Sequence, residues 1–172
     1  ELIIDQNKII FNEQEFKFPP AQMQLWRYIA RKKIDRCVRE DLEFCGTCNE
    51  CYSTHDELMD EFDNKISDEY FQIVGEGSAA WENRRVSIAE RERKSKKRET
   101  AADVAYEIDT RVRELKSKLK RNIKKKINEP RLYHQLQLVD EPIDDELTSM
   151  GCGLKVDKQA IHFINDNVAQ NR

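Results

Sequence analysis

The chain has no run of apolar residues close to the twenty that a membrane-spanning helix requires, and no signal peptide opens it. Membrane insertion and secretion are therefore not expected. Clustered cysteines without a secretory signal are typical of a reducing compartment, which predicts a cytoplasmic protein. The 172 residues suit a single domain, residues 1–172. Because the chain opens at Glu1, directly in a strand-like stretch, we expect it to be part of a longer protein.

The motifs of common catalytic sites are also missing, since the sequence contains neither a P-loop nor a nucleophile elbow. Glu57, Asp60 and Glu61 share a predicted helix with His55, but adjacent acids on an exposed helix are usually only solvated. Cys152 stands between two glycines and could be a reactive thiol, although a small residue in a turn is the simpler interpretation. We therefore expect no enzyme activity in this segment.

Aromatic residues are scarce in the most basic part of the chain. Residues 84–126 contain 17 Lys and Arg but a single aromatic residue, Tyr106, which disfavours the stacking of single-stranded nucleic acid. The same span carries 7 Asp and Glu, whereas the rest of the chain has 13 basic and 26 acidic residues. Two interpretations fit this segregation equally well. One is a surface that binds a polyanion, and the other is a solvated helix whose cations pair with acids of the same protein.

Four of the five cysteines are concentrated in fifteen residues: Cys37, then Cys45, Cys48 and Cys51 in a C-x2-C-x2-C run. Thiolates at this spacing can point at one centre, and Gly46 gives a tight turn the freedom it needs. The pattern predicts a metal knuckle over residues 37–55 that holds Zn²⁺. An iron–sulfur cluster is an alternative, although its usual fourth Cys followed by Pro is absent. Cysteines without metal or in disulfides are a third, and His55 could replace Cys37 as a ligand.

The first part of the chain predicts short strands followed by helices. Apolar residues in the first eighteen positions form strand-like groups separated by polar turns. Pro19-Pro20 favours a helix start, and apolar residues at spacings of three and four predict a helix to about Asp35 with one buried face. Thr54-x-x-Glu57 is a capping box, so a second helix should begin there.

The middle of the chain predicts a charged segment and then a long basic helix. Residues 75–100 read as a charged linker or insertion; the almost wholly charged 84–99 suit a mobile linker or an exposed helix, and partial disorder is favoured. In the helix predicted from Ala102 to Asn128, one continuous apolar stripe extends over more than six turns. That stripe consists of Val104, Ile108, Val112, Leu115, Leu119, Ile123 and Ile127.

The last part predicts a return to strands. Pro130 should stop the long helix, Tyr133 to Val139 resembles a strand, and Asp140 to Asp145 an acidic loop. Gly151-Cys152-Gly153 suggests a sharp turn, followed by strands at 154–156 and 161–164.

This order predicts an α+β fold, mainly α, of the winged helix-turn-helix type with a Cys-rich insertion and a long basic helix. Residues 2–30 resemble the effector domain of OmpR-type response regulators, which begins with a small sheet and a similarly spaced helix. Such domains have about 100 residues, however, and lack cysteines between their first two helices.

A second resemblance covers most of the chain outside residues 84–99. The block Pro19-Pro20-x4-Leu25-Trp26-x-Tyr28-Ile29-Ala30, the segments Cys37–Glu40 and Cys45–Tyr52, the helix at 111–128 and the stretch 153–156 resemble the C-terminal region of a family of CRISPR-associated proteins. Members of that family carry an N-terminal CARF sensor, which binds cyclic oligoadenylate and is not part of this sequence. Ribonucleases of the HEPN type, often fused to such sensors, need Arg-x4-His, but Glu50, Glu129 and Asp157 stand five residues before the three histidines.

The resemblance and the residues together imply a non-catalytic, DNA-binding module of an antiviral defence protein. In a winged helix the basic third helix can lie in a DNA groove while the wing touches the backbone. An alternative is a protein–protein interaction or homodimerisation module that docks on the sensor domain or another type III component. The residues assigned to nucleic-acid contact are Arg111, Arg113, Lys116, Lys120, Arg121 and Lys124.

Overall fold

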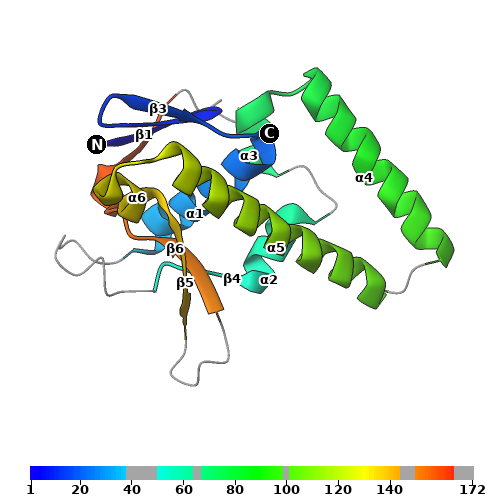
Figure 1. Ribbon diagram of the computed structural model, residues 1–172. Coiled ribbons are helices and arrows are strands. Elements are labelled where there is room, and N and C mark those ends of the chain that lie inside the picture. Colours follow the sequence, from blue (N-terminus) through cyan, green and yellow to red (C-terminus); the bar gives the residue numbers. More distant parts are fainter. Residues whose placement is uncertain (38–49, 64–66, 99–100, 144–149, 165–172) are drawn as a thin grey trace.

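A computed structural model describes residues 1–37, 50–63, 67–98, 101–143 and 150–164 (Figure 1). The fold is α+β and mainly helical, as predicted. Its helices are α1 (Pro20–Arg36), α2 (His55–Phe62), α3 (Asp68–Val74), α4 (Ala79–Arg98), α5 (Ala101–Lys126) and α6 (Pro130–Leu136), with a 3-10 turn at Lys158–Ala160. Its strands are β1 (Leu2–Asp5), β2 (Lys8–Phe11), β3 (Gln14–Lys17), β4 (Ser53–Thr54), β5 (Leu138–Pro142), β6 (Met150–Leu154) and β7 (Ile161–Phe163).

The opening strands form a four-stranded sheet in the order β3-β2-β1-β7, so the strands predicted in the first eighteen residues are confirmed. The β1, β2 and β3 strands are antiparallel neighbours, and β7 pairs with β1 in parallel, with Leu2 opposite Ile161. Alternate residues such as Leu2, Ile4 and Ile9 are buried, as expected for strands with one face on a core.

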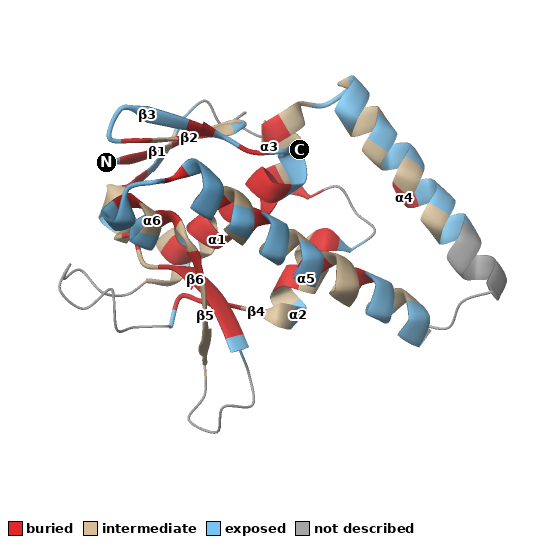
Figure 2. Ribbon diagram, in the orientation of Figure 1, coloured by how far each residue is buried: buried red, intermediate tan, exposed pale blue. Residues whose placement is uncertain are grey.

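The α1 helix lies at the centre of the molecule and is confirmed close to its predicted bounds. Its buried face includes Met23, Leu25 and Trp26, none of which is measurably exposed. Figure 2 shows this helix in the buried colour over most of its length. The predicted capping box is also confirmed, because the Thr54 hydroxyl accepts from the Glu57 amide while the Glu57 carboxylate accepts from the Thr54 amide.

The second sheet has the order β4-β6-β5 and contains the β5–β6 hairpin. The prediction of a sharp turn at residues 151–153 is wrong, because these residues lie inside β6, with Cys152 opposite Ser53 on one side and Asp140 on the other. The glycines serve packing instead of a turn. A Cβ built on Gly153 would lie 2.1 Å from Cδ1 of the buried Tyr52 ring, so the ring fits only over a residue without a side chain.

The strand predicted at residues 133–139 is also wrong over most of its length. Residues 130–136 form α6, and the strand begins only at Leu138. Proline suits the first turn of a helix as well as the end of one, and Leu132 and Leu136 are four residues apart and both buried, which is the helical period. The acidic loop expected from Asp140 is correspondingly shortened, since residues 140–142 belong to β5.

The long helix is confirmed as one continuous element, α5, over Ala101–Lys126. Its predicted stripe faces the core, with Val112, Leu119 and Ile123 essentially inaccessible. The sequence favours partial disorder for residues 84–99, but residues 84–98 are helical and belong to α4. The alternative prediction of an exposed helix therefore applies to them. Ile88 is the one buried apolar side chain among the α4 residues whose burial is described. Within the described part of the chain, no helix combines the length and apolarity needed to cross a membrane.

The contact between Gly153 and Tyr52 gives a stability prediction. Gly153→Ala should lower the free energy of unfolding by about 1–3 kcal/mol, because the new methyl group overlaps a ring that cannot move aside in a packed core. Urea denaturation measures this cost. In a Tyr52→Ala background the same change should cost clearly less, since the ring is gone; an equal cost in both backgrounds would contradict the packing argument.

Candidate nucleic-acid interface

The first two residues assigned to nucleic-acid contact already have carboxylate partners on their own helix. Arg111 donates from Nη2 to Oε1 of Glu107 at 3.2 Å, and Arg113 donates from Nε to Oδ1 of Asp109 at 2.9 Å. Both acids stand four residues before their arginine, the spacing at which side chains meet on a helix surface. The hydrogen bond from Arg113 lowers the pKa of Asp109. These exposed pairs reduce the local positive field without contributing much stability.

The next two residues, Lys116 and Lys120, share one carboxylate, which belongs to a strand of the second sheet and not to α5. Oδ2 of Asp140 on β5 accepts a hydrogen bond from Lys120 at 2.5 Å, and Oδ1 forms an ion pair with Nζ of Lys116 at 2.6 Å. Burial of Asp140 opposes its ionisation, but the hydrogen bonds from the two lysines outweigh that effect and lower its pKa. Asp140 therefore fixes the hairpin strand to α5 and neutralises half of the charge that these lysines bring.

Arg121 and Lys124 stand apart from the other four assigned residues. Both are exposed, and within the described part of the chain no carboxylate forms an ion pair with either one. Lys124 continues the row of Lys116 and Lys120 at four-residue steps, beyond the reach of Asp140. We call the exposed cations at this end of α5 and the start of α6 the C-terminal basic patch; it consists of Arg121, Lys124, Lys125, Lys126 and Arg131.

The C-terminal basic patch has a second physical effect besides its outward field. Unpaired carbonyls at the end of a helix carry partial negative charge, so cations in the last turn are stabilising there. Lys126 in addition lies over the Phe18 ring, with its Nζ 5.8 Å from the ring centre. Part of the charge thus serves the fold, while Arg121 lies one turn before the helix end and faces solvent.

His55 is engaged in a contact that links two helices. Its Nε2 lies 2.5 Å from Oδ1 of Asp109, the same carboxylate that Arg113 contacts, so Asp109 joins the start of α2 to α5. The interpretation of His55 as a substitute metal ligand would require its other ring nitrogen.

The predicted metal knuckle is described only at its two ends. Cys37 is the C-terminal cap of α1, with its amide bonded to the Lys33 carbonyl at 3.1 Å, and Cys51 is buried two residues before β4 begins. Cys45 and Cys48 lie outside the described residues. Among the residues that are described, no three His, Cys, Asp or Glu side chains form a metal-binding group. The Zn²⁺ or iron–sulfur hypothesis for the four cysteines therefore stays a prediction.

Cys152, the remaining cysteine, lies in the interior of the second sheet. Its side chain is buried in β6, and this burial raises the pKa of the thiol to about 12. A thiol with such a pKa carries almost no thiolate at neutral pH, and the thiolate is the reactive form. Its small size lets it fit between Ser53 and Asp140 of the neighbouring strands.

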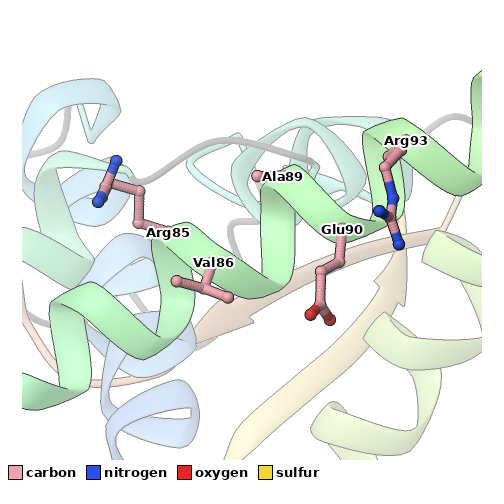
Figure 3. A pocket seen from close by; sticks show the side chains of 5 residues that line it. All are labelled: Arg85, Val86, Ala89, Glu90 and Arg93. Atoms are coloured by element: carbon pink, nitrogen blue, oxygen red, sulfur yellow. The ribbon is translucent and has the colours of Figure 1, made fainter.

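Sequence reasoning did not identify Asp140 as the partner of Lys116 and Lys120. The Glu107 and Asp109 pairs could have been found, because their spacing to Arg111 and Arg113 is local. Asp140 is twenty residues from Lys120 and carries no local signal. A shallow depression of about 280 Å³ on α4 was equally unforeseen. Its described lining residues, Arg85, Val86, Ala89, Glu90 and Arg93, all belong to that single helix (Figure 3).

Comparison of the chain with known protein families, with curated proteins and with solved structures found no match in any of the three. Function must therefore be inferred from the chain's own residues and their geometry.

Proposed function

We propose that this chain is a non-catalytic winged-helix module that binds double-stranded DNA through α5 and is braced by a metal held by Cys37, Cys45, Cys48 and Cys51. The observation that carries the proposal is the C-terminal basic patch, whose cations face solvent at the end of the helix that precedes the hairpin. Following the resemblance in the cysteine block, the proposed context is a cytoplasmic CRISPR-associated protein with a CARF sensor outside this segment.

The winged-helix assignment is supported by the order and pairing of the elements. Winged helices have a short strand after the first helix and a hairpin after the third, and the three strands form one antiparallel sheet. Here β4 follows α1, the β5–β6 hairpin follows α5 and α6, and β4 pairs with β6. In this correspondence α1, α2 and α5 are the three helices of the motif, which is supported by the packing of α5 against both α1 and α2. The α3 and α4 helices then form an insertion between its second and third helices.

The electrostatics favour the C-terminal half of α5 as the phosphate-binding part. Arg111, Arg113, Lys116 and Lys120 must exchange a carboxylate for a phosphate, whereas Arg121 and Lys124 need no such exchange. If the five cations of the C-terminal basic patch each neutralise one phosphate, affinity should fall by roughly two to three orders of magnitude between 50 and 200 mM salt.

The proposed metal site fits the two ligands that are described. Cys37 ends α1 and Cys51 precedes β4, and both elements pack against β6. A buried thiol such as that of Cys51 suits a thiolate only if a cation compensates its charge. When bound, a Zn²⁺ closed by four thiolates supplies folding free energy and leaves no open position for catalysis. The cysteines would then hold the 37–51 segment to the core.

An interaction or dimerisation module is the second candidate, and a different observation favours it. Val86 of α4 and Tyr106 of α5 are 51% and 73% exposed, and α4 lies at the edge of the molecule with little of its surface covered (Figures 1 and 2). Exposed apolar side chains on a protruding helix pair are suited to a partner helix or to the sensor domain. Light scattering of a salt-insensitive dimer without DNA affinity would support this candidate.

The DNA-binding proposal predicts a charge-specific loss. The double variant Arg121→Gln/Lys124→Gln should bind duplex DNA roughly tenfold or more weakly at 50 mM salt and reduce the slope of log affinity against log salt by about 1.8. Fluorescence polarisation with a labelled duplex measures both quantities. The matched control Arg111→Gln/Arg113→Gln removes the same charge from ion-paired positions and should have the smaller effect. A wild-type affinity that is flat with salt would remove DNA binding from consideration.

The position of Asp140 predicts a change in the opposite direction. Asp140→Asn should tighten DNA binding by roughly tenfold at low salt, because it releases two lysines beside the C-terminal basic patch. Glu141→Gln serves as the control, since Glu141 pairs with Lys155 at 2.7 Å and not with α5. Equal effects of the two substitutions would mean that Lys116 and Lys120 do not contact DNA.

The metal proposal predicts that Cys48→Ser lowers the melting temperature and loses bound metal, because one of four ligands is removed. Elemental analysis and thermal unfolding of the purified protein measure the two effects. Cys152→Ser is the control and should retain the metal, because Cys152 is not among the four predicted ligands and is buried in β6. Metal-free wild-type protein with unchanged melting of the Cys48 variant would refute the site.

A further inference from the structure

A pocket of about 370 Å³ lies where five helices meet. It is lined by the starts of α1 and α3, the end of α2, and the facing sides of α4 and α5. Its wall is largely apolar, with Phe62, Tyr70 and Leu115 among the lining residues. Its polar residues are mainly cationic, with Arg84 and Arg111 the two arginines. Neither belongs to the C-terminal basic patch.

A third arginine stands beside the pocket. Arg91 follows Arg84 by two turns on α4, so the two side chains lie on the same face as the buried Ile88. The charges of both side chains interact with that of Arg111 on α5. Burial is the first cause that lowers the pKa of Arg84, and the charges of Arg91 and Arg111 lower it further. Burial and the charge of Arg111 likewise lower the pKa of Arg91, and the charge of Glu107 offsets them only in part.

Acids of the described chain do not balance these three arginines. Glu107 pairs with Arg111, while Glu114, the acid among the lining residues, pairs with Lys118 at 3.1 Å. Arg84 lies over the Tyr70 ring, 5.8 Å from its centre, and Arg91 donates to the hydroxyl of Ser87 at 3.0 Å. Among the described residues, neither Arg84 nor Arg91 has an ion-pair partner.

Two of the guanidinium nitrogens are also without hydrogen bonds. The Nη1 atoms of Arg91 and Arg111 are inaccessible to solvent and have no hydrogen-bond acceptor in the described part of the chain. An unpaired buried donor costs about 1–3 kcal/mol and a charged one more, and like charges in contact add to that cost. A bound anion would lower this cost, because it supplies both acceptors and a compensating charge.

We propose that Arg84, Arg91 and Arg111 bind a phosphate group at this pocket. The planar fork of a guanidinium matches the oxygens of a phosphate, and three arginines from two helices could surround it. The apolar lining would hold the uncharged remainder of a small phosphorylated molecule. The site is separate from the C-terminal basic patch, so it stands whether or not that patch binds DNA.

The test compares inorganic phosphate with chloride at equal ionic strength. Phosphate should raise the melting temperature of the wild type, and Arg84→Gln/Arg91→Gln should abolish that rise. In chloride the same variant should be at least as stable as the wild type, because two repelling charges are gone; a merely structural role of the arginines would make it less stable. The control Arg85→Gln/Arg93→Gln removes equal charge from the outer side of the same helix (Figure 3) and should keep the response.

Further variants and a DNA-binding measurement identify the source of the phosphate and show that the result does not depend on misfolding of one variant. The single variants Arg91→Gln and Arg84→Lys should each weaken the apparent affinity for phosphate roughly tenfold, so the result does not depend on one double variant. If Arg84→Gln/Arg91→Gln binds duplex DNA like the wild type, the ligand is a small phosphorylated molecule. If its DNA affinity falls, the phosphate is that of a nucleic acid. Equal melting of the wild type in phosphate and chloride, or an undiminished phosphate response in the inner variants, overturns the proposal.

Discussion

The burial of α1 is the constraint on which the other elements depend. A helix enclosed on nearly every side has to satisfy its polar side chains inside the protein. Lys33 donates from Nζ to the Leu154 carbonyl at the end of β6, Arg27 pairs with Glu69 of α3 at 2.9 Å, and Trp26 donates from Nε1 to the Leu136 carbonyl of α6. Each of these contacts joins α1 to a segment at least 42 residues away in sequence. They hold the second sheet, α3 and α6 in fixed positions relative to α1. The aliphatic stripe of α5 packs against α1 as well.

The cations of α5 therefore fall into three groups along the helix, which differ in their carboxylate partners. Its first half carries acids at i−4 of its arginines, so Arg111 and Arg113 are paired within the helix. Its middle faces β5, where Asp140 neutralises part of the charge of two lysines. Only at its end do cations face solvent without a partner among the described residues. Of the two interpretations of the charge segregation in the sequence, intramolecular pairing applies to four of the six residues assigned to nucleic-acid contact. The polyanion-binding interpretation remains a proposal for the other two, Arg121 and Lys124.

The elements that the sequence predicted well are those with a local cause. The α1 and α5 helices follow from apolar periodicity, and the α2 helix from the reciprocal bonds of Thr54 and Glu57, all of which involve residues within a few turns. The failures have non-local causes. Gly153 is a glycine because Tyr52 lies over it, which no turn rule anticipates, and Pro130 starts a helix because Leu132 and Leu136 find a place on the core. For the candidate site, sequence reasoning identified the basic residues of α5. It did not identify Asp140, which pairs with two of them and so limits which cations are available to a phosphate. Asp140 approaches α5 only when the β5–β6 hairpin folds.

Asp140 also determines how the proposed interface would respond to a polyanion. A phosphate approaching Lys116 and Lys120 competes with a carboxylate that is already in place and partly buried, so it gains only the difference between the two interactions. A phosphate at Arg121 or Lys124 meets no such competitor and displaces only water and counterions. Binding energy should consequently be concentrated at the end of α5 nearest α6, and the middle of the helix should contribute to affinity only if the hairpin strand shifts away. In the proposed interface a long basic helix would thus present only a short binding surface, because the acids of the folded chain set its limits.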